Sequence, residues 1–301
     1  TDAEQLAYLL KYDTSHRNYR IDEISYEGND LIVKGRKIKV YAEMDPKNLP
    51  WKELEIDEVF ECTGKFVKKD AAIAHIEAGA KKVIISAPAK GDVKTIVYNV
   101  NHDTLDGTEQ IISAASCTTN CLAPVCKVLN DVFGIEKGYM TTVHAYTNDQ
   151  AILDVAHKKG AKARRGRAGA ANIVPSSTGA ASAIGLVIPE ISGKLKGSAM
   201  RVPVTDGSVV DLTLELSRNT TVEEINQALK EHANETMGYT EDPIVSSDII
   251  GSRYGSMVDG LLTDVLEVDG KQLVKVIAWY DNEMSYSAQM VRTAEYLGTM
   301  K

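Results

Sequence analysis

The chain has 301 residues, of which 44% are hydrophobic, 25% are charged and 6% are aromatic, and its formal net charge is −8. These fractions exclude a disordered or collagen-like chain, and the length suits about two globular domains. The acidic total disfavours broad binding to nucleic acid or to an anionic membrane surface. Three of the four cysteines lie between Cys117 and Cys126, which suits a reducing compartment better than a disulfide framework. We therefore expect a cytoplasmic protein that binds neither nucleic acid nor membranes.

The first half of the chain alternates helices with short strands. Thr1-Asp2-Ala3-Glu4 has the pattern of a helix-capping box, and the helix that follows is expected to bury Leu6, Leu9 and Leu10. Residues 58–61 and 83–86 are expected to be strands, joined by an alanine-rich helix over residues 71–80. Strand, helix and strand in this order predict a parallel sheet with crossover helices. Because the chain begins within an element, we expect that part of this domain precedes Thr1.

The second half has longer predicted strands. A helix with apolar residues at one face runs to Gly134 and is followed by strands over residues 140–145, 209–216 and 273–279. Amphipathic helices are expected near residues 222–233 and 286–297, and a long loop is expected over residues 148–172. This pattern favours a largely antiparallel sheet with helices on one face. The predicted fold class is therefore α/β followed by α+β.

Cys117 lies directly before the helix that ends at Gly134. A cysteine at a helix N-terminus meets unpaired backbone N–H groups and the positive end of the helix dipole. Such a position lowers a thiol pKa toward ~3.5–7.5 and predicts a thiolate nucleophile, although a buried packing cysteine fits the same pattern. Cys121 and Cys126 are expected to pack in the core. Their spacing is not that of a zinc site, and we expect no metal.

His144 is the best candidate for the base that a thiol nucleophile needs, because it ends a predicted strand. The cationic segment 157–167, the hydroxyls of residues 176–178 and the isolated Arg201 are suited to binding anions. Together these features predict a small phosphorylated substrate that is handled covalently. No two glycines are two residues apart, so the chain has no G-x-G-x-x-G motif for a nucleotide.

These motifs, in this order, closely resemble those of phosphorylating glyceraldehyde-3-phosphate dehydrogenases. The resemblance begins at Ser116–Cys121 and His144–Asp149, covers the whole chain, and includes residues 84–90, 175–181, 200–203 and 279–283. It implies a Rossmann-like dinucleotide-binding domain over residues 1–116 and 283–301, and a mostly antiparallel catalytic domain over residues 117–282. Compared with the family pattern, the first strand–helix–strand unit with its Gly-rich turn, about thirty residues, is expected to be missing.

The resemblance also implies a mechanism. Cys117 attacks the aldehyde, and His144 raises its nucleophilicity and moves the proton. Hydride passes to NAD, which the family favours over NADP, and inorganic phosphate cleaves the resulting thioester to 1,3-bisphosphoglycerate. A homotetramer is implied as well.

The resemblance assigns the binding residues by position. Those that would hold the substrate's own phosphate are Thr147 and Arg201. Those that would hold the attacking phosphate or nearby substrate groups are Ser116, Thr118, Arg165 (with Arg164 as the less favoured choice), Thr178 and Gly179. Those that would contact the nucleotide are Met44 through its backbone, Thr63, Ser86 and Asn282.

Two alternatives stay open at this point. One is an erythrose-4-phosphate dehydrogenase, against which the sequence Tyr146-Thr147-Asn148-Asp149 argues and which a comparison of the two aldehydes would identify. The other is a truncated, non-catalytic chain that keeps assembly or binding surfaces, and it predicts no efficient NAD-dependent turnover.

Overall fold

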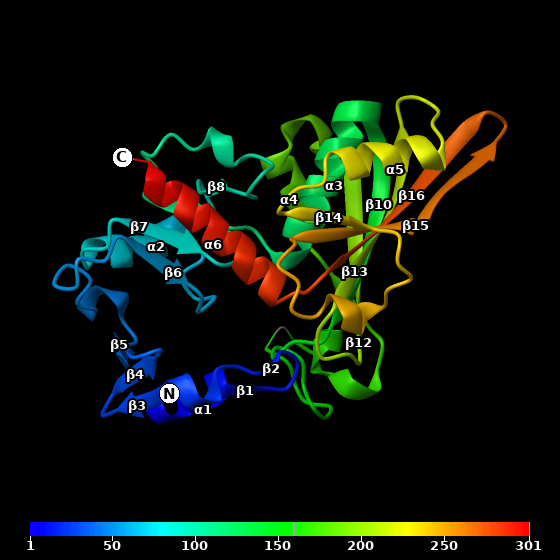
Figure 1. Cartoon of the computed structure of the whole chain (residues 1–301). Coiled ribbons are helices and arrows are strands. Elements are labelled where there is room, and N and C mark those ends of the chain that lie inside the picture. Colours follow the sequence, from blue (N-terminus) through cyan, green and yellow to red (C-terminus); the bar gives the residue numbers. More distant parts are fainter. Residues whose placement is uncertain (159, 301) are drawn as a thin grey trace.

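The computed structural model describes residues 1–158 and 160–300. Figure 1 shows a group of helices and strands built on a short parallel sheet, another built on a long mixed sheet, and an N-terminal group, in blue, with a small antiparallel sheet. In the described part of the chain, no helix is both long enough and apolar enough to cross a membrane. Short 3₁₀ helices occur at Ile21–Glu23, Pro46–Asn48, His102–Thr104, Arg164–Gly166, Gly169–Ala171, Pro189–Ile191 and Ser246–Ile249.

The N-terminal segment forms helix α1 (Ala3–Lys11), the hairpin β1–β2 (Tyr12–Asp13, Arg17–Asn18) and a three-stranded antiparallel sheet, β3–β5 (Ile24–Glu27, Asp30–Val33, Arg36–Lys39). Two predictions for α1 were wrong, namely the capping box that begins at Thr1 and the burial of Leu6, Leu9 and Leu10. The N-cap is Asp2, whose side chain accepts a hydrogen bond from the N–H of Gln5 at 2.8 Å. The buried positions are Ala3 and Ala7, because the helix lies against β3 and β4 through its small residues, and Leu9 and Leu10 are exposed.

The parallel sheet has the strand order β6-β7-β9-β8 (Glu58–Glu61, Lys82–Ile85, Ile111–Ser113, Lys94–Thr95). Successive side chains of β7 point to opposite faces. Val83 and Ile85 pack with helix α2 (Lys69–Glu77), whereas Ile84 packs with the last helix, α6 (Met284–Thr299). Figure 1 shows α6, in red, crossing one face of this sheet. The predicted crossover arrangement, with a strand buried on both faces, is confirmed.

The mixed sheet has the order β11-β12-β10-β13-β16-β15-β14 (Val174–Ser177, Leu195–Val202, Ile135–Ala145, Ser208–Leu216, Lys271–Tyr280, Ser256–Val268, Met237–Thr240). The pairs β10–β12 and β14–β15 are parallel, and the other neighbours are antiparallel. One apolar core forms from alternating residues of the central strands, such as Val210 and Leu212, and from residues of α3, α4 and α5 (Cys117–Phe133, Ala180–Val187, Val222–Glu231). The largely antiparallel sheet is therefore confirmed, although β11, β12, β14 and β15 were not predicted.

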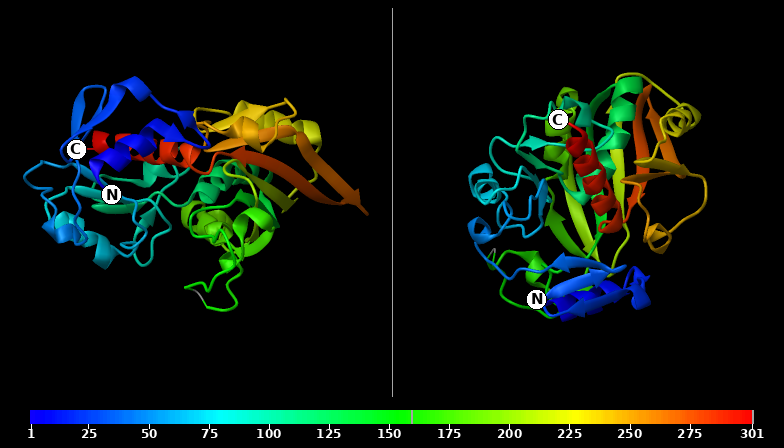
Figure 2. Two further views of the ribbon diagram at one scale, coloured as in Figure 1. Left: turned by 90° about the horizontal axis from the view of Figure 1, so that it is seen from below. Right: turned by 60° about the vertical axis from the view of Figure 1, so that its left-hand side comes forward.

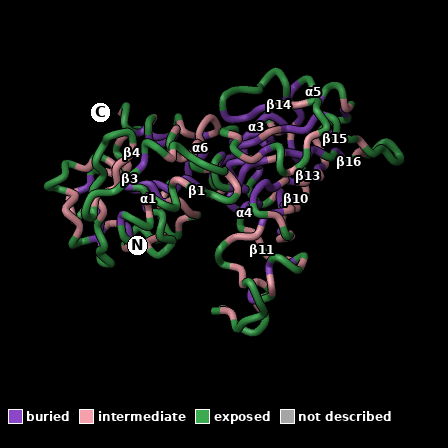
Figure 3. Tube along the Cα trace, turned by 60° about the horizontal axis from the view of Figure 1, so that its bottom comes forward, coloured by how far each residue is buried: buried purple, intermediate pink, exposed green. Residues whose placement is uncertain are grey.

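The buried backbone is concentrated in the mixed sheet and in α3, as Figure 3 shows. By contrast, much of the chain between residues 148 and 172 is exposed and projects from the body of the molecule (Figures 2 and 3). Its exposed apolar side chains include Ile152 and Leu153. The long loop expected here is present, and it contains two short 3₁₀ turns.

Candidate active site

Cys117 is the first residue of α3, as the sequence predicts. The preceding Ser116 is the N-cap, and its Oγ accepts a hydrogen bond from the N–H of Thr119 at 3.2 Å. The corner between β9 and α3 contains Ala115, which is fully buried and has a φ of 59°. Non-glycine residues rarely adopt this conformation, and such strain concentrates at functional sites. A sharp corner therefore sets the position of the Cys117 sulfur, and no residue type in the sequence signals it.

His144 lies near the end of β10 and is buried. Its Nε2 is 3.5 Å from Sγ of Cys117. Its Nδ1 is 2.7 Å from the carbonyl oxygen of Ala145 and 2.8 Å from Nη1 of Arg201, which donates to the same carbonyl at 2.8 Å. We assign the ring proton to Nδ1, because it then donates to the carbonyl oxygen and leaves the lone pair of Nε2 facing the sulfur.

Opposing effects act on the charge state of this pair. Desolvation raises the pKa of the Cys117 thiol, whereas the Thr118 hydroxyl, the Arg201 charge and the helix N–H groups lower that pKa. Burial, with the positive charge of Arg201, lowers the pKa of His144 to about 3. A neutral imidazole at this distance is competent to accept the thiol proton. The thiolate at Cys117 stays a prediction.

Tyr280, at the end of β16, supports both members of the pair. Its fully buried hydroxyl group lies 2.9 Å from Oγ1 of Thr118 and 2.8 Å from Oγ1 of Thr142. Its ring meets the His144 ring edge to face, with centroids 5.8 Å apart. The sequence analysis missed Tyr280, because only the pairing of β16 with β13, and of β13 with β10, brings this distant residue to the site.

The predicted phosphate residues Thr147, Arg165 and Arg201 come together beside His144. The parallel register of β10 and β12 places His144 opposite Arg201. Nη1 of Arg201 donates to Oγ1 of Thr147 at 3.3 Å, and the Thr147 hydroxyl donates to Oδ1 of Asp149 at 2.6 Å. The other oxygen of Asp149 accepts a hydrogen bond from Arg165. The cluster therefore carries two guanidinium groups against one carboxylate.

This cluster has an unpaired hydrogen-bond donor that could bind an anion. The Nε atom of Arg201 is buried and has no hydrogen-bond acceptor in the described part of the chain. Burial and the neighbouring Arg165 charge lower the pKa of Arg201. A buried donor without a partner, next to a second cation, is an arrangement that a phosphate oxygen would satisfy.

The other predicted phosphate residues are less closely joined. Thr178 and Gly179 lie at the start of α4, where Oγ1 of Thr178 accepts a hydrogen bond from the N–H of Ala180 at 3.2 Å. Among the described residues, no hydrogen bond links Thr178 to Cys117 or Arg201. The Thr118 hydroxyl faces Tyr280 instead of open space.

A cavity of about 1240 Å³ lies beside the cluster. It reaches from residues that follow β6 and β7 to the polar cluster near His144. Ligands of parallel sheets bind outside the carboxyl ends of the strands, and this cavity occupies that place. Its lining comprises Cys62, Ser86, Ala87, Tyr146–Ile152, Gly169, Ala170, Arg201, Thr205 and Glu283.

Comparison with known proteins identifies the family. The model of the glyceraldehyde 3-phosphate dehydrogenase C-terminal domain matches residues 116–282, and the model of the NAD-binding domain of the same enzymes matches residues 1–69. The chain belongs to the glyceraldehyde-3-phosphate dehydrogenase family. Curated relatives with this name include proteins of Clostridium pasteurianum (62% identical over 296 residues) and Clostridium acetobutylicum (60% over 296 residues), and each alignment covers 98% of this chain and 88% of the relative. A Streptococcus pyogenes relative is 60% identical over 297 residues, with the same coverage.

Family membership confirms the predicted fold class, a Rossmann-type NAD-binding domain with a mostly antiparallel catalytic domain, and it confirms NAD as the cofactor. The residues of the cavity fit a dinucleotide of this kind. Ser86 directly follows β7 and lines the cavity. Thr63 follows β6, donates its hydroxyl to the buried Glu61 and is not among the residues that line the cavity. Met44, by contrast, is 84% exposed and does not line the cavity.

A hydrogen bond fixes the orientation of the side-chain amide of Asn282. Its buried Oδ1 accepts a hydrogen bond from Oγ of Ser208 at 2.6 Å. The same Oγ accepts a hydrogen bond from the N–H of Ala145 at 3.1 Å, next to His144. Ser208 thus connects Asn282 to the end of β10, the strand that carries His144. The sequence analysis missed Ser208, since a single serine at the start of a strand carries no distinguishing signal.

Proposed function

We propose that this chain catalyses the NAD-dependent oxidative phosphorylation of D-glyceraldehyde 3-phosphate to 1,3-bisphosphoglycerate, a reaction of glycolysis. The observation that carries the proposal is the 3.5 Å approach of the Cys117 sulfur to Nε2 of His144, beside a cluster of two arginines. The curated relatives bear the name of this enzyme, which favours it over the erythrose 4-phosphate and non-catalytic alternatives.

The chain's own residues account for the proton and sulfur chemistry. Nε2 of His144 takes the thiol proton as the Cys117 sulfur forms a bond to the aldehyde carbon, and the hydrogen bond from Nδ1 to the Ala145 carbonyl holds the ring in place. NAD, when bound, would supply the acceptor for the hydride on that carbon. The product on the protein is a thioester at Cys117. An oxygen of inorganic phosphate attacks the thioester, and the released sulfur recovers the proton from His144.

The anion-binding residues divide into two groups in this proposal. Arg201 and Thr147 hold the phosphate of the aldehyde, and the unpaired Nε of Arg201 supports this role. The residues that hold inorganic phosphate or the reacting end of the substrate are Ser116, Thr118, Arg165, Thr178 and Gly179. The residues that contact NAD are Thr63, Ser86, Asn282 and the backbone of Met44.

We further propose that residues 1–116 with 283–301 form the dinucleotide-binding domain and residues 117–282 form the catalytic domain. The packing of α6 on the parallel sheet supports this division. A homotetramer in the cytoplasm is also proposed. Ile152, Leu153 and Ile173 expose 87%, 73% and 68% of their surface, which is typical of residues that a neighbouring subunit covers. Native mass spectrometry of the purified protein tests the tetramer.

The activity test follows the absorbance of reduced NAD with glyceraldehyde 3-phosphate as the substrate. Sustained turnover should require inorganic phosphate, should be lost in Cys117→Ala and should persist in Cys126→Ala, which removes a buried packing thiol. Faster turnover of erythrose 4-phosphate would contradict the substrate assignment. Turnover by Cys117→Ala would contradict the nucleophile.

A further inference from the structure

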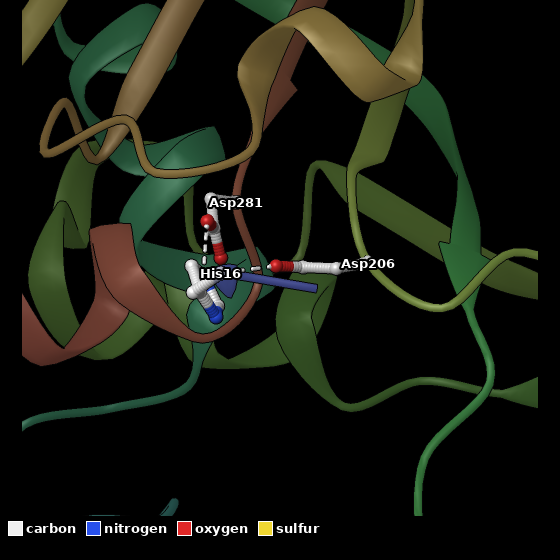
Figure 4. A group of neighbouring side chains, drawn as sticks. All are labelled: His16, Asp206 and Asp281. Carbon is white, nitrogen blue, oxygen red and sulfur yellow. Dashed lines mark hydrogen bonds and ion pairs between the residues drawn. The ribbon is translucent and has the colours of Figure 1, made fainter. Parts of the chain in front are cut away.

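Three side chains from distant parts of the sequence converge, as Figure 4 shows. His16 lies in the turn of the β1–β2 hairpin, Asp206 lies between β12 and β13, and Asp281 follows β16. Nε2 of His16 is 2.9 Å from Oδ2 of Asp281 and 3.3 Å from Oδ2 of Asp206. The three ligand atoms all lie within 4.8 Å of one another. Because 265 residues separate His16 from Asp281, no sequence spacing could indicate this cluster.

The cluster has an excess of negative charge. The side chains of both aspartates are fully buried, and the side chain of His16 is 19% exposed. Asp13 and Glu283 add further negative charge nearby. In the described part of the chain, no lysine or arginine forms an ion pair with any of these four carboxylates. The site therefore attracts either a proton or a cation.

One buried oxygen of the cluster lacks a hydrogen bond. Oδ1 of Asp206 accepts from the N–H of Gly207 at 2.7 Å, but Oδ2 receives no hydrogen bond in the described part of the chain and faces His16. Buried carboxylate oxygens without a donor are uncommon and call for an unseen ion or proton. Oδ2 of Asp206 is therefore the atom of the cluster that is available to bind an ion or a proton.

The other two ligands are held in position by their surroundings. Oδ1 of Asp281 accepts from the N–H groups of Glu283 and Met284 at 2.8 Å each, and Oδ2 accepts from the N–H of Gly251 at 2.7 Å. Nδ1 of His16 lies 3.3 Å from Oδ1 of Asp13. Metal-binding histidines commonly donate their second ring nitrogen to a carboxylate in this way, which leaves the other nitrogen free to bind the ion.

We propose that Nε2 of His16, Oδ2 of Asp206 and Oδ2 of Asp281 bind a divalent transition-metal cation such as Zn²⁺, with water completing the coordination. One imidazole and two carboxylates are ligands that Zn²⁺ accepts, and their two negative charges balance the ion. Metal–ligand bonds of about 2.0–2.2 Å in a tetrahedron place the ligands roughly 3.3–3.5 Å apart. The His16–Asp206 distance already fits, and the His16–Asp281 pair needs to open by a few tenths of an ångström.

Such an ion would join the N-terminal hairpin to the junction between β16 and α6, one residue from Asn282. The prediction is a gain in stability that is independent of the catalytic chemistry, so it does not rest on the proposed function. The ion also replaces the proton that otherwise links His16 to Asp281 in the 2.9 Å contact.

The test uses full-length protein freed of metal by a chelator, in a Cys117→Ala background so that the reactive thiol binds no metal. Titration with Co²⁺ should give a visible absorption band that saturates at one equivalent per chain and disappears when Zn²⁺ is added. Zn²⁺ should also raise the thermal unfolding midpoint. Both effects should be absent in His16→Ala and Asp206→Asn, and both should persist in the control variants His232→Ala and Asp242→Asn, whose side chains lie outside the cluster.

Asp206→Asn keeps the test decisive even if His16→Ala folds poorly. Without metal this variant should be at least as stable as its parent, because it removes the repulsion between two buried carboxylates. If the parent binds no Co²⁺, or if Asp206→Asn binds Co²⁺ as well as the parent does, the proposal is overturned and the cluster holds a shared proton instead.

Discussion

Replacing Ser208 with alanine tests whether Asn282, a proposed cofactor contact, depends on the hydrogen bonds that connect it to β10. The Ser208 hydroxyl donates to Oδ1 of Asn282 at 2.6 Å and accepts from the N–H of Ala145 at 3.1 Å. Both partners are buried. A buried polar group that loses its partner costs about 1–3 kcal/mol, so two such groups should lower the free energy of unfolding by about 2–6 kcal/mol.

The same substitution should weaken NAD binding. In the proposed site, the amide of Asn282 loses the hydrogen bond that fixes which of its ends would face the cofactor. If about 1–2 kcal/mol of orientation is lost, the dissociation constant for NAD rises roughly 5–30-fold. Quenching of tryptophan fluorescence on NAD titration gives the dissociation constant, and steady-state kinetics give the KM for NAD. The increase in the KM for NAD should exceed any increase in the KM for the aldehyde.

Ser256→Ala is the matched control, since it removes another fully buried serine hydroxyl, whose side-chain partner is the thiol of Cys121 at 3.7 Å. It should leave NAD binding unchanged. Unaltered NAD affinity in Ser208→Ala, with stability reduced as calculated, would show that Ser208 has only a structural role. Equal weakening by both variants would refute the argument as well.

Three further outcomes are expected. Gly207→Ala should unfold or lose at least about 3 kcal/mol of stability, because its φ is +85° and a new Cβ would lie 2.1 Å from a backbone carbonyl oxygen. Gly251→Ala has the same φ but open space around the new Cβ, so it should lose only about 1–2 kcal/mol. Denaturant unfolding measures both losses. Burial raises the pKa of Cys121 to about 12, so peptide mapping after brief iodoacetamide treatment at neutral pH should find Cys121 unmodified, and its rapid modification would contradict the packing. Arg201→Gln should lower kcat/KM for the phosphorylated aldehyde roughly 10–150-fold, the loss of about 1.5–3 kcal/mol of charged hydrogen bonding. The loss should be smaller for an unphosphorylated aldehyde, and an equal loss for both aldehydes would contradict the phosphate role of Arg201.

The elements with strong local patterns could be predicted from the sequence. The helix that begins at Cys117 and ends at Gly134 has a serine cap, one apolar face and a glycine stop, and it forms with those bounds. Strand β7 was likewise predicted, from a short and continuously apolar run, and it lies between two helix layers. The predicted face of α1 was wrong because periodicity alone does not show whether leucines or alanines meet the partner sheet.

The site could be predicted only where its residues carry their own chemistry. Cys117, His144 and Arg201 are conspicuous by type, but their meeting depends on strand register, which places Arg201 opposite His144 across parallel strands. Tyr280 and Ser208 act through hydrogen bonds between distant strands, and their residue types are common in any core. The helix end beside Cys117 is visible in the sequence, whereas the desolvation that raises the pKa of its thiol is a property of the packed structure.

The most direct test of the central claim is to mix the protein with glyceraldehyde 3-phosphate and NAD in the absence of inorganic phosphate. If Cys117 forms the thioester with His144 as its base, a single burst of about one reduced NAD per active site should appear. Mass spectrometry after acid quenching should then place one phosphoglyceroyl group on Cys117. Adding phosphate should release it and restore turnover, and His144→Gln should slow the burst by about 10²–10⁴-fold. A burst without modification of Cys117, or a modification on another residue, would contradict the account.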